Sequence, residues 1–522
     1  MLALLLPLTA CGGDPPQIVD YAPQRGAIDV STAAPVRISF DHDVDEQSVE
    51  SRLRLAPITS GSVRWLSAHQ LLYEHPTLRT STIYEVILEA GYRDPAGNTY
   101  SLRHHWTFTT EGPPSLSAAA PANGDAGVDP AAYLRLDFTR EMDPTTLKLA
   151  ITFIPNVPFD VRLNPTDERQ AIIAPSQLLD PNTAYRIELD ETALDVDGNQ
   201  LSRPQAIHFT TGSVHPLQHW IAFTTQGIDG APGGLWIVNE QGFPRQLFAS
   251  AGVQSFSWSP DGASVLIQLD GETWWQLSPG ADPVALSFKA PWASALATGM
   301  GFVYIDDAGT LHRQVAGSSD QVIERDVTEA AVSPNGLRVA FIQGGLNSTE
   351  IWGYDVGLQA RYKLLTDTAP VTSVAWAPAG NRIAYLRRDP TTVTLRVRAL
   401  TGAAATTTVM TGDLGSPEWL PDSTHIVFAA AVATSGGAVS HKAFVINAAA
   451  PPPTLSLAAG LPADPNIEVS SPASSPDGHQ IAFLSGDQVW LMNADGTRPI
   501  ELTKEDLGSF PYSCRAPAWT RT

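Results

Sequence analysis

The chain has few features that cross-link a protein, attract it to nucleic acid or hold it across a membrane. Only two cysteines, Cys11 and Cys514, occur in 522 residues, so stability must come from packed cores. Basic residues are scarce, 32 against 54 acidic ones, and the formal net charge of −22 opposes binding to nucleic acid or an anionic bilayer. After Cys11 no run approaches the roughly 18 apolar residues of a membrane span. We therefore expect everything after Cys11 to be soluble.

The first residues form a short apolar run that ends in Leu8, Thr9, Ala10 and Cys11. A small residue suits cleavage by a signal peptidase, and only a cysteine thiol can carry a diacylglycerol thioether. These four residues resemble the lipobox of bacterial lipoproteins. The resemblance implies a signal peptide over residues 1–10, a lipidated linker over residues 11–15, and lasting attachment through the acyl chains on Cys11.

This lipoprotein hypothesis places the protein in the cell envelope, lipid-anchored on the extracytoplasmic side, at the cell surface or the outer membrane. The run is short and lacks a positive flank, so we expect the true start to lie upstream. The alternative is an ordinary signal in which Cys11 is incidental. Gly12 and Gly13 carry no evident inner-membrane retention signal, which favours an outer surface.

Turn residues are abundant, with 42 Pro and 40 Gly, and they interrupt β-branched and aromatic runs every ten or so residues. This pattern is typical of an all-β protein, and we find no long helix. Residues 16–112 and 113–212 repeat one order of features. Each stretch has an Ala-Pro-x-x-Gly opening, alternating strands, a Gly-Asn turn and a closing Phe-Thr-Thr.

About 100 residues with short alternating strands fit an immunoglobulin-like (Ig-like) sandwich without the Cys-Trp-Cys core. The two stretches resemble the bacterial Ig-like family first associated with surface-layer proteins. The resemblance implies spacers or adhesive units and no catalytic residue. Asp195, Asp197 and Asn199 suit either a calcium loop or a tight turn, and turn chemistry favours the turn. His104, His105, His208 and His215 lack metal-ligand spacing, so we expect no metal and no cofactor.

From residue 213 to 522 a different unit repeats. Its turn signature is Trp258-Ser259-Pro260-Asp261-Gly262, with variants that include Trp376, Trp419 and Pro476-Asp477-Gly478. In five copies an apolar strand starts seven residues after the Trp position, at Val265, Val339, Ile383, Ile426 and Ile481. Fixed spacing of this kind indicates one recurring geometry.

Two further apolar strands, at Ile221 and Phe302, bring the count to seven units of about 44 residues, which is typical of four-stranded propeller blades. We predict seven blades, with six as the alternative. The last strand, before Trp519, is expected to complete the first blade and remove an exposed edge; a strand at Val214 is the alternative. The blades resemble the WD40-like repeats of the TolB propeller family. That resemblance is specific for fold and weak for function.

The sequence offers no reaction centre. A hydrolase domain with its nucleophile elbow is missing, and Ser255, Ser257 and Ser259 lack a base in any motif. Arg387, Arg388, Asp306 and Asp307 are candidates for a channel site of the lyase or sialidase kind, although exposed loop or strand positions suit such charges better. The motif tryptophans are expected to pack between blades. One ring of Trp274 or Trp275 should face outward and offer a contact surface.

We therefore expect a non-enzymatic, lipid-anchored envelope protein in which two Ig-like domains and a propeller bind another envelope protein or a membrane assembly. One alternative is adhesion or a surface-layer role through glycans. The other is a polysaccharide-acting enzyme that uses the propeller channel. Converging carboxylates at the channel mouth would favour the enzyme, and an apolar channel would weaken it.

Overall fold

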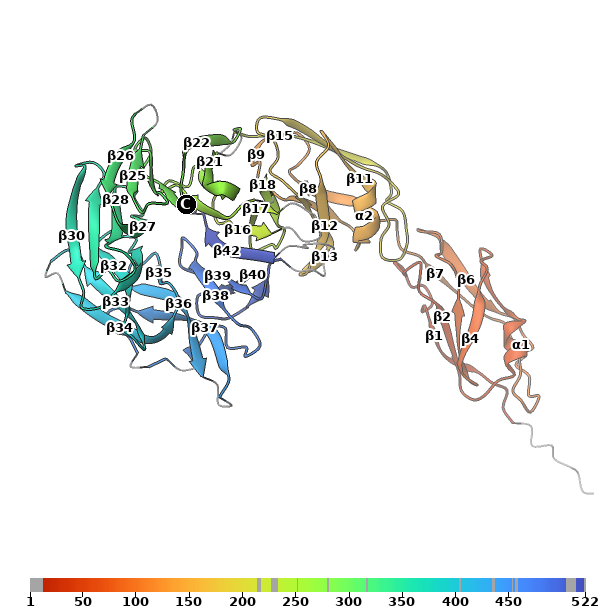
Figure 1. Cartoon of the computed structure of the whole chain (residues 1–522). Coiled ribbons are helices and arrows are strands. Elements are labelled where there is room, and N and C mark those ends of the chain that lie inside the picture. Colours follow the sequence, from red (N-terminus) through yellow and green to blue (C-terminus); the bar gives the residue numbers. More distant parts are fainter. Residues whose placement is uncertain are drawn as a thin grey trace, which may run out of the picture. The chain divides into compact units, whose positions relative to one another are not determined.

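The computed structural model describes residues 13–213, 217–226, 233–250, 252–278, 281–315, 318–402, 405–433, 437–452, 454–455, 459–503 and 513–520. Strands dominate these residues, and the helices α1 (Glu46–Glu50) and α2 (Pro144–Ala150) are short (Figure 1). None of the helices in the described ranges has the length and apolar character that a membrane span requires. The all-β expectation is confirmed.

The chain divides into two compact units. The first comprises residues 1–128, 132–174 and 184–210, and the second comprises residues 129–131, 175–183 and 211–522. The first unit holds two β-sandwiches that repeat each other. The second holds a succession of antiparallel sheets.

In the first sandwich, sheet β1-β2-β5-β4 packs on sheet β3-β6-β7 around one core. The strands of this sandwich are β1 (Ile18–Ala22), β2 (Val36–Phe40), β3 (Leu53–Ala56), β4 (Ser62–Ser67), β5 (Gln70–Glu74), β6 (Ile83–Leu88) and β7 (His104–Thr109). Strand β2 shows why the sheet has an inner face. Val36, Ile38 and Phe40 are buried while the residues between them are only half-buried, as the two-residue period of a strand dictates.

The second sandwich repeats this order and adds one strand. Its sheets run β12-β13-β10-β8 and β11-β14-β15-β9. The strands are β8 (Leu116–Ala120), β9 (Asp125–Val128), β10 (Leu134–Phe138), β11 (Ile151–Ile154), β12 (Phe159–Asn164), β13 (Asp167–Pro175), β14 (Ala184–Leu189) and β15 (Gln205–Thr211). Equivalent aspartates cap the two helices: Asp45 accepts from the Ser48 amide at α1, and Asp143 accepts from the Thr145 amide at α2.

The second unit is a β-propeller, in which the strands fall into successive antiparallel sheets from yellow-green to blue (Figure 1). The sheets are β16 (Ile221–Gln226) with β17 (Gly234–Val238), β18 (Arg245–Ala249) and β42 (Ser513–Trp519); β19 (Ser255–Trp258), β20 (Val265–Leu269), β21 (Thr273–Leu277) and β22 (Val284–Lys289); β23 (Trp292–Ala295), β24 (Phe302–Ile305), β25 (Leu311–Gln314) and β26 (Gln321–Glu324); β27 (Val327–Val332), β28 (Arg338–Gln343), β29 (Glu350–Asp355) and β30 (Ala360–Thr366); β31 (Val371–Trp376), β32 (Arg382–Arg388), β33 (Val393–Ala399) and β34 (Thr406–Leu414); β35 (Glu418–Trp419), β36 (His425–Ala433) and β37 (Val439–Asn447); β38 (Ser470–Ser474), β39 (Gln480–Ser485), β40 (Gln488–Asn493) and β41 (Ile500–Glu501). Strand β34 also pairs with β36, which joins two of these groups into one sheet. The count of seven blades stays a prediction.

The spacing of seven residues in the sequence is a strand register. Trp258 pairs with Val265, Trp376 with Ile383, and Trp419 with Ile426. The same offset joins Ala295 to Phe302, so Ala295 holds the motif position in the sheet whose turn signature is missing from the sequence.

The last described strand closes the ring. Strand β42 pairs antiparallel with β16, and Trp519 lies opposite Ile221. The amide of Thr520 also donates to the carbonyl of Trp220 at 2.8 Å. The sheet edge at β16 is thereby paired, as the repeat of the motif at Trp519 predicts. The alternative strand at Val214 lies outside the described residues.

Cys514 on this closing strand predicts a chemical test of ring closure. Its side chain is 2% exposed, and burial raises the pKa of the thiol to about 12. A rise of about 3 pKa units leaves roughly 10³-fold less thiolate, which is the reactive form. In a chain carrying Cys11→Ser, we expect alkylation of Cys514 at pH 8 to be slower by about that factor than after denaturation. If Cys514 in the native protein were alkylated as fast as in the denatured protein, the closing strand would not be packed as described.

Candidate functional site

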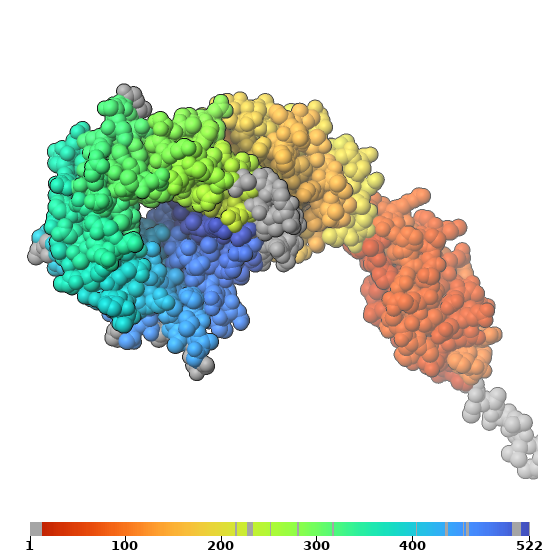
Figure 2. Space-filling model, viewed as in Figure 1, coloured from red at the N-terminus to blue at the C-terminus, as the bar shows by residue number. Residues whose placement is uncertain are grey.

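The innermost strands of the propeller line an axial cavity of about 580 Å³. Its walls come mainly from the turn motifs, and they include Trp258, Pro260, Pro334, Trp376, Pro378, Glu418, Trp419, Pro476 and Trp519. A second hollow, of about 630 Å³, shares Phe256, Glu418 and Ala518 with the first. Figure 2 shows the recess between the green and the blue parts of the chain. Successive repeats therefore contribute equivalent apolar residues to one central space.

The motif tryptophans tie neighbouring sheets together. The indole Nε1 of Trp376 donates to the Ala331 carbonyl at 3.0 Å, and that of Trp419 to Ala375 at 3.3 Å. Trp519 makes the equivalent bond to the Ala473 carbonyl at 3.0 Å. Each acceptor directly precedes the motif position of the neighbouring sheet. These contacts are of the inter-blade kind that the sequence predicts.

Trp258 departs from this pattern. Its side chain is 5% exposed, and its indole N–H has no hydrogen-bond partner among the described residues. By the repeat, the acceptor would be the carbonyl of Ala518 on the closing strand. Both residues line the axial cavity. A buried donor without an acceptor costs about 1–3 kcal/mol, so this position favours a ligand that brings an acceptor.

Charge is sparse around the cavity. The carboxylates in the two linings are Asp413 and Glu418, and Glu418 accepts from the Ser474 amide at 3.1 Å. In the part of the chain that the structure describes, no group of His, Cys, Asp and Glu is arranged to hold a metal ion. The walls suit an apolar or backbone-rich ligand better than a charged substrate.

The four channel candidates lie elsewhere, and none is among the residues that line the two hollows. Arg387 pairs with Asp367 at 3.3 Å and with Asp389 at 2.7 Å, and Arg388 donates to the hydroxyl of Thr372. Asp306 pairs with His312 at 3.0 Å. The carboxyl of Asp307 contacts the carboxyl of Glu272 and raises the pKa of Glu272. Spacing along the strands does not report which side chains reach the axis.

The three candidate serines have structural partners. Ser259 donates to Asp261 at 2.6 Å and accepts from the Ser264 amide, which holds the turn together. Ser255 donates to Gln268, and Ser257 contacts the hydroxyl of Ser294.

The remaining motif residues shape the turns. Asp261 also accepts from the Ala263 amide, and Gly262 has a φ of 67°, a left-handed conformation that favours glycine. Asp477 accepts from Ser475 and from the His479 amide, and Gly478 has a φ of 76°. The sequence Ser-Pro-Asp-Gly is therefore explained by turn geometry.

Trp274 and Trp275 separate as neighbours on a strand do. Trp274 is 2% exposed and donates to the Ala290 carbonyl at 2.8 Å, so its ring faces inward. Trp275 is partly exposed beside a hollow of about 450 Å³ that Asp270 and Thr273 also line. Leu8, Thr9, Ala10 and Cys11 lie outside the described residues.

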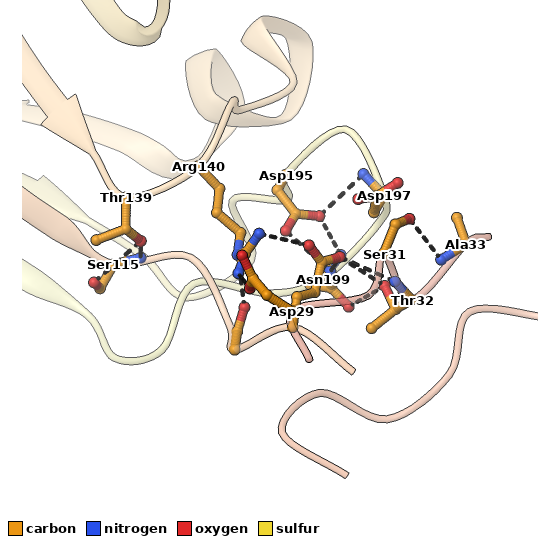
Figure 3. A network of polar contacts seen from close by, with 12 residues as sticks. Asp29, Ser31, Thr32, Ala33, Ser115, Thr139, Arg140, Asp195, Asp197 and Asn199 are labelled. Atoms are coloured by element: carbon orange, nitrogen blue, oxygen red, sulfur yellow. Dashed lines mark hydrogen bonds and ion pairs between the residues drawn. The ribbon is translucent and has the colours of Figure 1, made fainter. Parts of the chain in front are cut away.

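A polar site, separate from the axial cavity, joins the two sandwiches of the first unit (Figure 3). Glu111 is 4% exposed, and its Oε1 accepts from the Thr32 amide at 3.0 Å and from Asn199 Nδ2 at 3.1 Å. Its Oε2 accepts from Arg140 Nη1 at 2.6 Å. The hydroxyl of Thr32 donates to Asn199 Oδ1 at 2.9 Å. Sequence inspection missed this site because its members are far apart in the chain.

The turn that suggested calcium contributes to this junction. Asp195 Oδ1 accepts from the amides of Asp197 and Asn199 at 3.1 and 2.7 Å, as a tight turn requires. Asn199 Nδ2 donates to the other oxygen of Asp195 at 3.0 Å. The carboxylate is therefore engaged by the turn itself.

The buried carboxyl of Glu111 makes the junction sensitive to pH. Burial raises the pKa of Glu111, and the neighbouring Asp197 carboxyl raises it further. The folded state then holds this proton more tightly than the unfolded chain. Stability is lost as pH rises through the raised pKa, and it is fully present below the ordinary value of 4.5.

We expect Asp197→Ala to stabilise the first unit at pH 7.5 by about 0.5 kcal/mol, the scale of one partly exposed charge pair. Alanine is also the residue at the equivalent position of the first sandwich, Ala96. The gain should shrink at pH 4. Urea unfolding at both pH values measures it. A loss of stability at pH 7.5 would contradict repulsion between the two carboxyls.

Comparison with known proteins identifies the first unit. The model of the bacterial Ig-like domain family matches residues 13–110 and again residues 111–211. The chain therefore carries two bacterial Ig-like domains in tandem, as the sequence resemblance implies. No curated protein matches the chain.

Several solved structures are similar to the chain at low identity. TolB from Acinetobacter baumannii has 13% identity and a TM-score of 0.37, over 71% of this chain and 83% of that one. A TolB-type protein from Agrobacterium tumefaciens has 15% identity and a TM-score of 0.34, over 54% and 88%. An oligogalacturonate lyase in complex with manganese has 14% identity and a TM-score of 0.37, over 56% and 88%. The neighbours include TolB-type propeller proteins, and likenesses this distant carry no functional argument.

Proposed function

We propose that the protein is a non-catalytic binding protein of the bacterial envelope, and that it docks a peptide segment of another envelope protein or membrane assembly in the axial cavity. The observation that carries this proposal is the indole N–H of Trp258, which has no partner among the described residues and lies in a cavity lined mainly by tryptophan, proline and alanine. A peptide backbone supplies carbonyl acceptors at every residue. Prolines and tryptophans supply apolar area with little rotamer entropy to lose on binding.

The charge distribution supports binding over catalysis. General acid–base or nucleophilic chemistry needs paired groups within hydrogen-bond reach. The cavity walls hold the carboxylates Asp413 and Glu418, and Glu418 already accepts from the Ser474 amide. The candidates Arg387, Arg388, Asp306 and Asp307 are engaged with other side chains away from these walls. We therefore propose no enzymatic activity.

Site-specific photocrosslinking in the producing cells tests the docking site. A photoreactive residue at exposed Ala379, beside Pro378 of the cavity wall, should form one adduct whose peptide is identified by mass spectrometry. The same probe at Val284, which is 58% exposed on the outer strand β22, is the control. Adducts from Val284 and none from Ala379 would place the interaction outside the cavity.

A matched pair of substitutions tests the role of Trp258. Trp258→Phe removes an N–H that has no partner among the described residues, so it should weaken the Ala379 adduct about tenfold while leaving the fold stable, as expected for one lost hydrogen bond of about 1.4 kcal/mol. Trp376→Phe removes an N–H that already bonds Ala331, so it should cost stability and weaken the adduct less than Trp258→Phe does. The opposite result would refute the assignment.

We further propose that Cys11 carries the lipid anchor and that the Ig-like domains set the distance of the propeller from the bilayer. The lipobox resemblance supports the anchor. Metabolic labelling with a palmitate analogue should mark the protein, and Cys11→Ser should abolish the mark and release the protein from membranes. Unchanged labelling of the Cys11→Ser chain would reject Cys11 as the acylation site.

A further inference from the structure

The two bacterial Ig-like domains are joined by more than a linker. Contacts cross between them at three places in the first unit. Asn199 of the second domain bonds Thr32 of the first, Arg140 bonds Asp29, and the hydroxyl of Thr77 donates to the carbonyl of Asp197 at 3.3 Å. Arg140 also donates to the Gly112 carbonyl at 3.0 Å. The domains therefore hold each other through side chains of both.

Glu111 lies at the centre of these contacts. It is the second residue after β7, the closing strand of the first domain. It is bonded from both sides, by Thr32 on one and by Arg140 and Asn199 on the other. A buried carboxylate is tolerated only when charge and hydrogen bonds satisfy it. Separation of the domains would leave Glu111 without Arg140 and Asn199. Opening would break these bonds, so the bonds from Arg140 and Asn199, and not the burial of the carboxylate, favour the closed junction.

Comparison of the repeats shows that the arrangement is specific to this junction. Asp94 and Asn98 form the same turn in the first domain, where Asn98 Nδ2 donates to Asp94 at 2.6 Å. The position equivalent to Glu111 after the second domain is Gly212, because Thr110 and Thr211 make equivalent bonds. Among the described residues, the turn of the second domain therefore makes an interdomain contact to Glu111 and Thr32, while Asn98 bonds within its own turn.

We propose that the two Ig-like domains form one rigid rod, and that the buried side chain of Glu111, with Asn199 and Arg140, fixes their mutual orientation. This property is independent of the proposed binding at the propeller. A rigid rod keeps its two ends at a fixed distance and angle, whereas two domains on a flexible linker adopt many distances and angles. The two domains would therefore act together as a spacer of fixed length.

Distance measurement between the domains tests the proposal. Spin labels are introduced as Ile58→Cys and Leu149→Cys, at side chains that are 98% and 83% exposed, in the full chain carrying Cys11→Ser. Buried Cys514 stays unlabelled. Double electron–electron resonance should give a single narrow distance distribution. Asn199→Ala should broaden it by about twofold or more, as expected when interdomain contacts no longer restrain motion.

Two further variants keep the test decisive. Asn98→Ala removes the equivalent amide from the turn of the first domain and should leave the distribution unchanged. Thr32→Val keeps the size of the side chain but removes its hydroxyl bond to Asn199, and it should broaden the distribution without unfolding either domain. A broad distribution in the unsubstituted chain, or equal effects of Asn98→Ala and Asn199→Ala, would overturn the proposal.

Discussion

Replacement of Trp519 by alanine is expected to destabilise the propeller by about 3–5 kcal/mol, the range found when large buried aromatic side chains are truncated. Trp519 is 7% exposed, and it packs in a cluster with Ile221, Phe223 and Val238 of the first sheet. Its indole also bonds the Ala473 carbonyl of the preceding sheet. One side chain therefore supports both the closing pair β16·β42 and the contact to the neighbouring sheet.

Urea unfolding measured by near-ultraviolet circular dichroism gives the free energy, and alkylation of Cys514 reports the closing strand directly. Trp519→Phe isolates the hydrogen bond and should cost about 1 kcal/mol beyond the change in size. Trp258→Phe is its control, because it occupies the same repeat position and loses no bond within the described residues. Equal losses for the two phenylalanine variants would contradict the role assigned to the indole bond.

The propeller was largely predictable because its repeats are local. A tight Ser-Pro-Asp-Gly turn fixes how many residues separate paired positions, so the seven-residue spacing in the sequence appears as the pair Trp258 and Val265. Closure of the ring by the strand before Trp519 followed from the same repeat. The sheet that contains Ala295 was recognised only by its apolar strand at Phe302, because alanine at the motif position leaves no signature.

The sites were less predictable because they depend on contacts between distant residues. Trp258 belongs to the best-matching sequence motif, yet its indole is the one without a partner among the described motif tryptophans. Thr32 and Asn199 are 167 residues apart and meet only because the two domains pack end to end. Arg387 and Asp306 pair with neighbouring side chains away from the two hollows, and their spacing in the sequence does not report this. Position along a strand does not determine whether a side chain reaches the propeller axis or pairs with a neighbouring strand.

The second large effect is expected at Arg140. Arg140→Ala leaves the carboxylate of Glu111 buried without its cation, and we expect a loss of about 2–4 kcal/mol from the first unit at pH 8, somewhat below a fully buried pair because Arg140 is 24% exposed. Arg140 lowers the pKa of Glu111, in opposition to burial and to Asp197. Its removal therefore raises that pKa further.

The sign of this shift gives the prediction a second test. A carboxyl whose folded pKa is raised is destabilising above that pKa and neutral below the unfolded value, so the loss caused by Arg140→Ala should be largest at pH 8 and much smaller at pH 4. Arg64→Ala is the control, because the Arg64–Glu74 pair is exposed at both ends and should contribute at most about 0.5 kcal/mol at either pH. Urea unfolding of both variants at the two pH values compares them. A loss at Arg140 that is independent of pH would mean that its packing, and not its charge, supports the junction.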